Sequence, residues 1–198
     1  NPNFFSARMA GHVLFYPIGG PCPATSKSAR YSDVEPRRSF TLPHDKTWTL
    51  YLAGEVHTGW RDDIRRLAEQ AGLSARFTGP VTDHESSDAA GDVLGPAPQG
   101  DGTQRGKTYW RDAQSAGVNA IRTRTLIAEA DIVVVRFGDQ YKQWNAAFDA
   151  GYAAALNKPV ITLHAPALTH ALKEVDAAAS AVAQTPEQVV EVLRYLMS

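Results

Sequence analysis

Hydrophobic residues in this chain gather in short continuous runs that are separated by longer segments of helical periodicity. Residues 47–53 read TWTLYLA, a run of β-branched and aromatic residues that is typical of a buried strand. Residues 131–137 read DIVVVRF, and residues 160–163 form another apolar run, so both are predicted as strands buried on both faces. A shorter strand is predicted at 75–78. Such runs indicate a parallel sheet.

Segments with apolar residues at helical spacing lie between and after these predicted strands. The helices are predicted at 60–71, 120–129, 145–156, 166–175 and from Pro186 onward. The last one is the best marked, because Thr185 is an N-cap residue, Pro186 follows it and Gln188 completes a capping box. The tract 177–183 is predicted as helix or linker. Strands that alternate with helices imply right-handed crossovers and an α/β fold with a doubly wound, mainly parallel sheet.

Two segments lack a regular pattern. Residues 1–46 are predicted to form an irregular N-terminal extension, and residues 47–198 a single domain. Residues 1–32 contain basic residues and serines but no acid, a composition shared with organelle transit peptides, so targeting is the alternative interpretation. Residues 79–118 are poor in aliphatic residues and are predicted as a long loop, which is usually functional or disordered.

Composition narrows the classes of partner. The 198 residues carry a formal net charge of -1, which gives no global field to gather polymeric nucleic acid or an anionic membrane. Cys22 is the only cysteine, and no apolar run approaches the about 20 residues that span a bilayer. We therefore expect a soluble, cytoplasmic protein. No glycine-rich phosphate motif follows a predicted strand, so no nucleotide cofactor is expected.

Ligands of doubly wound sheets bind outside the carboxyl ends of the strands. Here those ends lead into three segments rich in polar and aromatic side chains, 54–60, 79–88 and 138–145. The candidate ligand-contacting residues of these segments are Gly54, Glu55, His57, Trp60, His84, Ser87, Asp88, Asp139, Gln140, Gln143, Trp144 and Asn145. Acid and base catalysis, substrate hydrogen bonding and metal ligation all suit such groups, and so does ordinary helix capping. We predict no metal site.

Asp149 is the strongest candidate for chemistry. If Asn145 is the N-cap, Asp149 lies one turn into the helix, where the helix dipole stabilises a carboxylate by about 0.3 to 1 kcal/mol. An ionised carboxylate there can attack an anomeric carbon or accept hydrogen bonds from sugar hydroxyls. The alternative is a solvent-facing aspartate that pairs with Lys142 or Lys158.

Gly151 lies in the same predicted helix, although glycine within a helix costs about 1 kcal/mol relative to alanine. Its presence predicts a close approach to the backbone by another helix, a second subunit or a ligand, and packing is the first of these explanations. Arg122 and Arg124 suit a substrate phosphate or a surface ion pair. The tryptophans at 60, 110 and 144 suit stacking on a nucleobase or burial.

Several of these motifs resemble the nucleoside 2-deoxyribosyltransferases. That family combines a first strand reading roughly Tyr-Leu-Ala-Gly with a later helix that holds an acid in Phe-Glu-x-Gly-Tyr-Ala, followed by Lys-Pro and a strand. This chain has YLAG at 51–54, FDAGYA at 148–153 and KP at 158–159. The run QYKQWN at 140–145 resembles the YtoQ branch of the same fold even more closely.

The resemblance implies a flavodoxin-like or Rossmann-like fold and cleavage or exchange of the N-glycosidic bond of a nucleoside or nucleotide. It gives Asp149 the position of the nucleophilic carboxylate and Tyr51 that of the tyrosine that orients it. Two departures stand out: Asp149 is one methylene shorter than the family's glutamate, and Gln143 stands where an acid usually protonates the leaving base. The candidate replacements for that acid are Asp139 and the loop histidines.

The same departures support an alternative, a non-catalytic module that senses a nucleotide-like ligand on the same fold. A third possibility is different chemistry on this scaffold, because a fold does not fix a function. Under either of the first two readings the resemblance implies a homodimer or higher homo-oligomer, since the transferases complete their pockets with residues from a neighbouring subunit.

Overall fold

A computed structural model describes residues 4–9, 12–17, 46–95, 104–139 and 143–198. The first two strands form a separate unit. In it, β1 (Phe4–Met9) pairs antiparallel with β2 (His12–Pro17), so that Phe4 lies opposite Pro17 and Met9 opposite His12. The sequence predicted irregular structure here. Both segments contain two aromatic residues, and the second also contains a valine, residue types that favour strands, which explains the difference.

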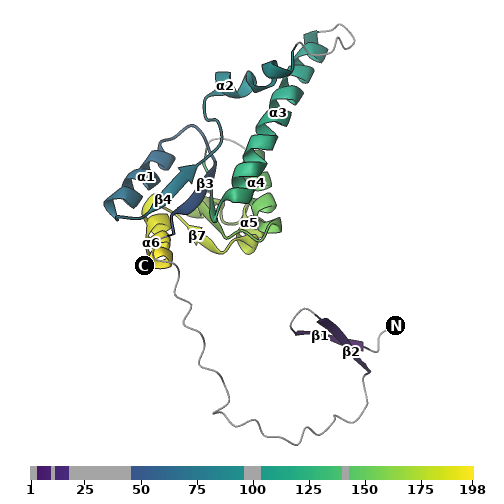
Figure 1. Ribbon diagram of the computed structural model, residues 1–198, viewed down its shortest axis with the longest axis vertical. Helices are drawn as coiled ribbons and strands as arrows, with labels where there is room; N and C mark the ends of the chain where they lie inside the picture. The colour runs from purple at the N-terminus through teal and green to yellow at the C-terminus, as the bar shows by residue number, and fades with distance from the viewer. Residues whose placement is uncertain (1–3, 10–11, 18–45, 96–103, 140–142) are drawn as a thin grey trace, which may run out of the picture. The chain divides into compact units, whose positions relative to one another are not determined.

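The second unit is built on one parallel sheet with the order β4-β3-β5-β6-β7 (Figure 1). Its strands are β3 (Trp48–Gly54), β4 (Ala75–Thr78), β5 (Ile132–Phe137), β6 (Val160–His164) and β7 (Ala181–Ala183). The doubly wound parallel sheet predicted from the sequence is confirmed. In strand numbers within this sheet the order is 2-1-3-4-5, the flavodoxin-like arrangement, with its switch point between β3 and β5.

Each face of the sheet carries its own core, because successive strand residues point to opposite sides. On one face Leu50 and Leu52 pack with residues of α1 (Trp60–Gln70) and α6 (Pro186–Met197). On the other face Tyr51 and Ala53 pack beneath α4 (Trp144–Ala155) and the end of α3 (Gln104–Glu129). The predicted N-cap of α6 is confirmed, since Thr185 Oγ1 accepts the Gln188 amide.

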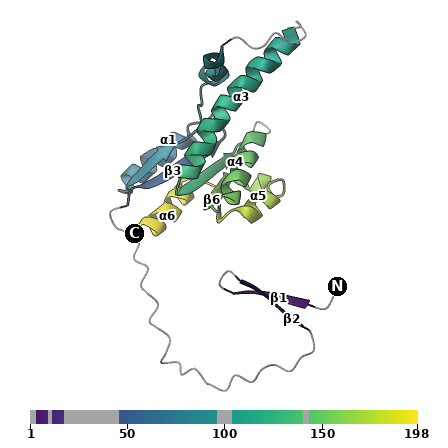
Figure 2. The same cartoon turned by 45° about the vertical axis from the view of Figure 1, so that its right-hand side comes forward.

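The predicted loop at 79–118 is wrong over much of its length. It contains α2 (His84–Asp88), the 3₁₀ helix η2 (Ala90–Leu94) and the first part of α3, which extends well beyond the sheet (Figures 1 and 2). Ser115 of α3 donates to the Asp88 carbonyl oxygen and accepts from the Gly91 amide. Because contacts of this kind are made by polar side chains, the segment lacks the helical spacing of apolar residues from which a helix is predicted. None of the helices in the described parts of the chain is long and apolar enough to cross a membrane.

The segment after β6 also differs from the prediction of one helix at 166–175. It folds as the 3₁₀ helix η3 (Pro166–Leu168) and α5 (Lys173–Ala178), and then as strand β7, where helix or linker was expected. The pairing of β7 with β6 decides this, because Val182 lies beside Thr162 in the ladder. An alanine-rich tract contains no signal for such a pairing.

Candidate active site

The carboxyl ends of β3 and β5 meet at Gly54, at the switch point of the sheet. Gly54 has a φ of +97°, and a Cβ atom built on it would lie 2.1 Å from the backbone oxygen of Arg136. The Glu55 amide donates to that same oxygen over 3.1 Å. Only glycine tolerates both the backbone angle and the contact. The glycine of the YLAG motif therefore lets the chain turn from β3 directly across the end of β5.

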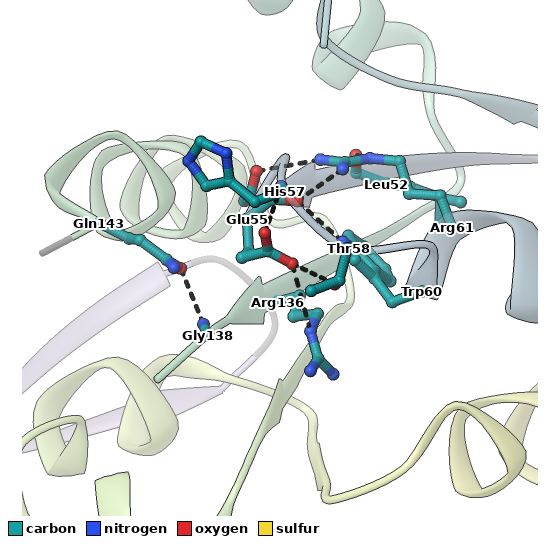
Figure 3. Close-up of polar contacts among 10 residues, drawn as sticks. Leu52, Glu55, His57, Thr58, Trp60, Arg61, Arg136, Gly138 and Gln143 are labelled. Carbon is teal, nitrogen blue, oxygen red and sulfur yellow. Dashed lines mark hydrogen bonds and ion pairs between the residues drawn. The ribbon is translucent and has the colours of Figure 1, made fainter. Parts of the chain in front are cut away.

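The Glu55 carboxylate lies buried within this turn, with 6% of the residue exposed. It accepts hydrogen bonds from the His57 amide and the Thr58 hydroxyl, and one oxygen lies 3.7 Å from Arg136 Nε (Figure 3). A Cβ atom built on Gly138 would lie 2.6 Å from Glu55 Cγ. Glu55 therefore joins the loop after β3 to the end of β5, and most of its bonding capacity is used within the protein.

Trp60 and Arg61 bind the backbone carbonyl groups at the end of β3. Trp60 Nε1 donates to the Glu55 oxygen over 2.8 Å, and Arg61 donates to the oxygens of Leu52, Gly54 and Glu55 over 3.0, 3.0 and 2.6 Å (Figure 3). Burial lowers the pKa of Arg61 to about 10, so it stays charged at neutral pH. Trp60 is 2% exposed. Its predicted contact with substrate is therefore wrong, because the ring belongs to the core.

Gln143 occupies the position before the first turn of α4 and closes the loop that follows β5. Its side-chain oxygen accepts the Gly138 amide over 3.0 Å (Figure 3). The sequence predicted Asn145 as the N-cap, whereas the helix is preceded by Gln143, two residues earlier. The bond to Gly138 holds Gln143 against the loop and explains the earlier start.

The other candidates of segment 138–145 lie on exposed parts of this loop and helix. Asp139 and Asn145 are exposed, and Trp144 is 73% exposed. Gln140 lies outside the described residues. The described side chains of the segment thus stand next to the carboxyl end of β5, as the sequence predicted for the edge of a parallel sheet.

Asp149 lies in the second turn of α4, between alanines that pack on the sheet. Ala146, Ala150 and Ala153 are buried in the same core as Tyr51, which turns the helix so that Asp149 is partly buried. The two groups that the family resemblance paired therefore lie on the same face of the sheet, Tyr51 within this cluster and Asp149 on the helix that covers it.

Burial raises the pKa of Asp149 to about 6. The sequence predicted that the helix dipole keeps this carboxylate ionised near neutrality, an influence that by itself would lower the pKa. Removal of water outweighs the dipole here, because a charged group loses its hydration when it is buried. At neutral pH the carboxylate is still mostly ionised, but its proton affinity is in the range that suits acid and base chemistry.

The pKa of Tyr51 is raised to about 12, first by burial and also by the charge of Asp149. The Thr123 side chain lowers the pKa of Tyr51, although its position does not meet the geometry of a hydrogen bond to the Tyr51 hydroxyl. Within the described residues the buried Tyr51 hydroxyl has no hydrogen-bond partner. A phenol that stays protonated can donate to a carboxylate or a ligand.

His57, in the loop after β3, and His84, the first residue of α2, come together beside the ends of β3 and β4. Their rings stack with centroids 5.5 Å apart. Ser87 and Asp88 are held differently, because Asn119 Nδ2 donates to the Ser87 oxygens and Ser115 donates to Asp88. These two candidates therefore connect α2 to α3. In the described residues no three His, Cys, Asp or Glu side chains gather as a metal site requires.

Gly151 does not have the packing role that was predicted for it. Nothing in the described structure lies within 4 Å of a Cβ atom built at this position, and the residue is exposed. The helix face that carries it also carries Phe148, which is 58% exposed. Packing against the residues that the structure describes therefore does not explain the glycine.

A cavity of about 570 Å³ opens beside the ends of β3 and β4. Its lining includes Arg61, Arg65 and Arg122, and Arg122 donates to the Gly79 oxygen over 2.7 Å. Arg124 instead lies 6.0 Å from the ring of Phe148, on α4. Trp110 is 39% exposed and packs edge-on to its neighbour Tyr109.

Sequence reasoning did not select Arg65 or Arg136. Arg136 could have been selected because it is a cation within the apolar run 131–137. It lies near the end of that strand, where it faces the Glu55 carboxylate. Arg65 carried no such signal, since an arginine three residues after an aspartate on a helix is ordinary surface pairing.

Residues 51–197 match the protein family described as "Nucleoside 2-deoxyribosyltransferase YtoQ". The chain is 36% identical over 148 residues to "Uncharacterized protein YtoQ" of Bacillus subtilis (strain 168), which covers 74% of this chain and 95% of that relative.

Solved structures with a similar backbone path include a conserved protein from Enterococcus faecalis V583. Its TM-score is 0.49 at 12% sequence identity, and the match covers 76% of this chain and 99% of that one. A 2-deoxyribosyltransferase from Bacillus psychrosaccharolyticus has a TM-score of 0.40, 16% identity and coverage of 73% and 95%. The match over residues 51–197, together with the identity to its Bacillus subtilis relative, shows that the chain belongs to the nucleoside 2-deoxyribosyltransferase YtoQ family.

Proposed function

We propose that this protein cleaves the N-glycosidic bond of a deoxynucleoside or deoxynucleotide and passes the deoxyribosyl group through Asp149 to a second base or to water. The observation that carries the proposal is a partly buried carboxyl, whose pKa is about 6, on the helix that covers the face of the sheet holding the buried phenol of Tyr51. The family of the chain, described as a nucleoside 2-deoxyribosyltransferase, supports the same chemistry.

The reaction proceeds in two displacements at the anomeric carbon. In the first, a carboxylate oxygen of Asp149 bonds to C1′ while the C1′–N bond breaks, and the electron pair of that bond leaves with the base, which takes up a proton. In the second, a nitrogen of another base or a water oxygen bonds to C1′ and loses a proton, while the Asp149 carboxylate departs. Two inversions give net retention of configuration.

Two other side chains take part in the chemical steps of this proposal, and three more contact the substrate. In this proposal the Tyr51 hydroxyl, which has no hydrogen-bond partner among the described residues, is available to donate to the Asp149 carboxylate and orient it when a substrate binds, since the phenol stays protonated at neutral pH. Asp139 supplies the proton to the leaving base, because Gln143 carries no acid and is bonded to Gly138. His57, His84 and Trp144 are the proposed contacts to the substrate.

The test is incubation with a panel of purine and pyrimidine deoxynucleosides and deoxynucleotides, with and without a second base, followed by chromatography of the free base. We expect release or exchange by the wild-type chain, its loss in Asp149→Ala, and a mass increase of the intact protein equal to one deoxyribosyl group. Absence of release from every compound refutes the proposal.

A second candidate function is a sensor that binds a nucleotide-like ligand without cleaving it. One observation favours it: Gln143, which stands at the position of the usual acid, is used to hold the loop backbone. A ligand that binds only the folded state raises the unfolding temperature by mass action. Stabilisation by a compound that is recovered intact after incubation supports the sensor, whereas recovery of free base supports the enzyme.

Self-association is proposed with either function. Large apolar side chains are exposed on α3 and α4, among them Ile121 at 71%, Trp144 at 73% and Phe148 at 58%. A second copy of the chain that covers them removes this surface from water. Light scattering at several concentrations is expected to give at least a dimer, and a monomer throughout contradicts the expectation.

A further inference from the structure

The cavity beside β3 and β4 concentrates positive charge in a chain that has little net charge. Three guanidinium groups, those of Arg61, Arg65 and Arg122, line it against one carboxylate, that of Asp62. Asp62 accepts from Arg65 over 2.8 Å, but its side chain is 82% exposed and well hydrated. The cavity therefore has two positive charges in excess, whereas the chain as a whole carries -1.

Two of the arginines are fixed before any ligand arrives. Arg61 spends three of its five N–H groups on the backbone oxygens at the end of β3, which leaves two for the cavity. Arg122 reaches from α3 to the Gly79 oxygen, on the opposite wall. Side chains held in this way lose little freedom when they bind a ligand, so they are organised for an anion in advance.

The guanidinium groups are the main donors of the cavity. Thr58 and Thr78 also line it, but their hydroxyl groups donate to the Glu55 carboxylate and to the Leu50 oxygen. Arginine is the side chain best suited to a phosphate, because its planar N–H groups pair with two oxygens at once. Guanidinium donors around one space are therefore the chemistry that recognises a phosphate group.

The cavity reaches strand β4 beside Tyr51. Thr78, which lines it, is the direct neighbour of Tyr51 in the parallel register of β4 and β3. Asp149 is not among the described residues that line the cavity. A substrate whose sugar lies at Asp149 therefore has to extend along the carboxyl end of β3 to place a phosphate among the arginines.

From this arrangement, and resting on the proposed glycosyl transfer at Asp149, we infer that the cavity lined by Arg61, Arg65 and Arg122 binds a phosphate group of the substrate. The substrate class is then the deoxynucleoside monophosphates, in preference to unphosphorylated deoxynucleosides. The cavity volume leaves room for a phosphate together with part of the nucleoside.

The test measures binding by titration calorimetry in the Asp149→Asn variant, in which the ligand stays intact. The probes are deoxyadenosine, its 5′-monophosphate, its 3′-monophosphate and inorganic phosphate. Arg65→Gln and Arg122→Gln are introduced singly and together. Arg66→Gln is the matched control, because Arg66 pairs with Asp63 as Arg65 pairs with Asp62 but does not line the cavity.

We expect one of the two monophosphates to bind at least about tenfold more tightly than deoxyadenosine, and each cavity variant to remove about tenfold, the usual effect of one charge-assisted hydrogen bond. Arg66→Gln is expected to leave the dissociation constants unchanged. Circular dichroism checks that every variant is folded.

Equal affinity for deoxyadenosine and both monophosphates overturns the inference, and so does a monophosphate preference that survives in the double variant. Tight binding of inorganic phosphate without any gain for the nucleotides also overturns it, because the site is then separate from the substrate. If the nucleotide binds through the arginines but no base is released by the wild-type chain, the inferred phosphate site stands and the proposed reaction fails.

Discussion

Replacement of Asp149 by asparagine is expected to make the protein more stable at neutral pH while abolishing base release. The side chain keeps its shape but cannot ionise. Burial raises the pKa of Asp149 from the ordinary 3.8 to about 6. That difference corresponds to about 3 kcal/mol that the folded state loses when the buried carboxyl ionises.

The sign follows from proton binding. Between pH 4 and pH 6 the folded state keeps a proton on Asp149 that the unfolded state has released, so the free energy of unfolding falls as the pH rises through this window. Above the folded pKa the full destabilisation is present. Asp149→Asn removes it, so the variant is expected to gain about 2 to 3 kcal/mol over the wild type at pH 7.5 and almost nothing at pH 4.

The measurement is urea denaturation followed by tryptophan fluorescence at pH 4, 5, 6 and 7.5, since the midpoint and slope give the free energy of unfolding. Asp112→Asn is the matched control, because Asp112 is an exposed aspartate on a helix and is expected to show no such pH dependence. A variant no more stable than the wild type at pH 7.5, or an equal gain at pH 4, refutes the reasoning. Higher stability with lost activity is the usual sign of a functional group held at an energetic disadvantage.

Three further predictions follow from individual contacts. Tyr51→Phe removes a buried hydroxyl that has no hydrogen-bond partner in the described residues, so the free energy of unfolding is expected to stay equal or rise while base release falls; a loss of stability in urea contradicts this. Arg61→Met removes three hydrogen bonds, which leaves the Leu52 and Gly54 oxygens without this donor and the Glu55 oxygen with Trp60 Nε1 alone, and we expect a loss of about 3 kcal/mol or more by the same measurement, with a loss below 1 kcal/mol counting against the assigned role. Gly151→Ala meets nothing within 4 Å, so it is expected to stabilise the isolated chain by about 0.5 to 1 kcal/mol in thermal or urea unfolding, and destabilisation shows instead that something outside the described residues approaches α4.

Much of the fold was decided by local patterns in the sequence. Apolar runs long enough for strands, bounded by Gly54 and by Pro159, specified β3, β5 and β6 because their side chains are buried on both faces of the sheet. The N-cap at Thr185 specified the start of α6 for an equally local reason, a hydroxyl placed to accept a free amide. Of the long helix α3 only residues 120–129 were predicted, because its outer part packs on η2 through Ser115 and carries no apolar stripe.

The sequence by itself also determined which residues stand at the carboxyl ends of β3 and β5, and with them Tyr51, Gly54 and Asp149. Only the tertiary structure decided how these groups ionise and which side chains surround them. Whether Asp149 is stabilised by a helix dipole or destabilised by burial depends on how α4 packs on the sheet. The cavity likewise joins Arg61 and Arg122, which are distant in sequence and meet only when α1 and α3 are brought to one edge of the sheet. The sequence pattern contains information on local periodicity. Burial of a carboxyl group and the clustering of like charges arise only when segments distant in sequence pack against one another and exclude water.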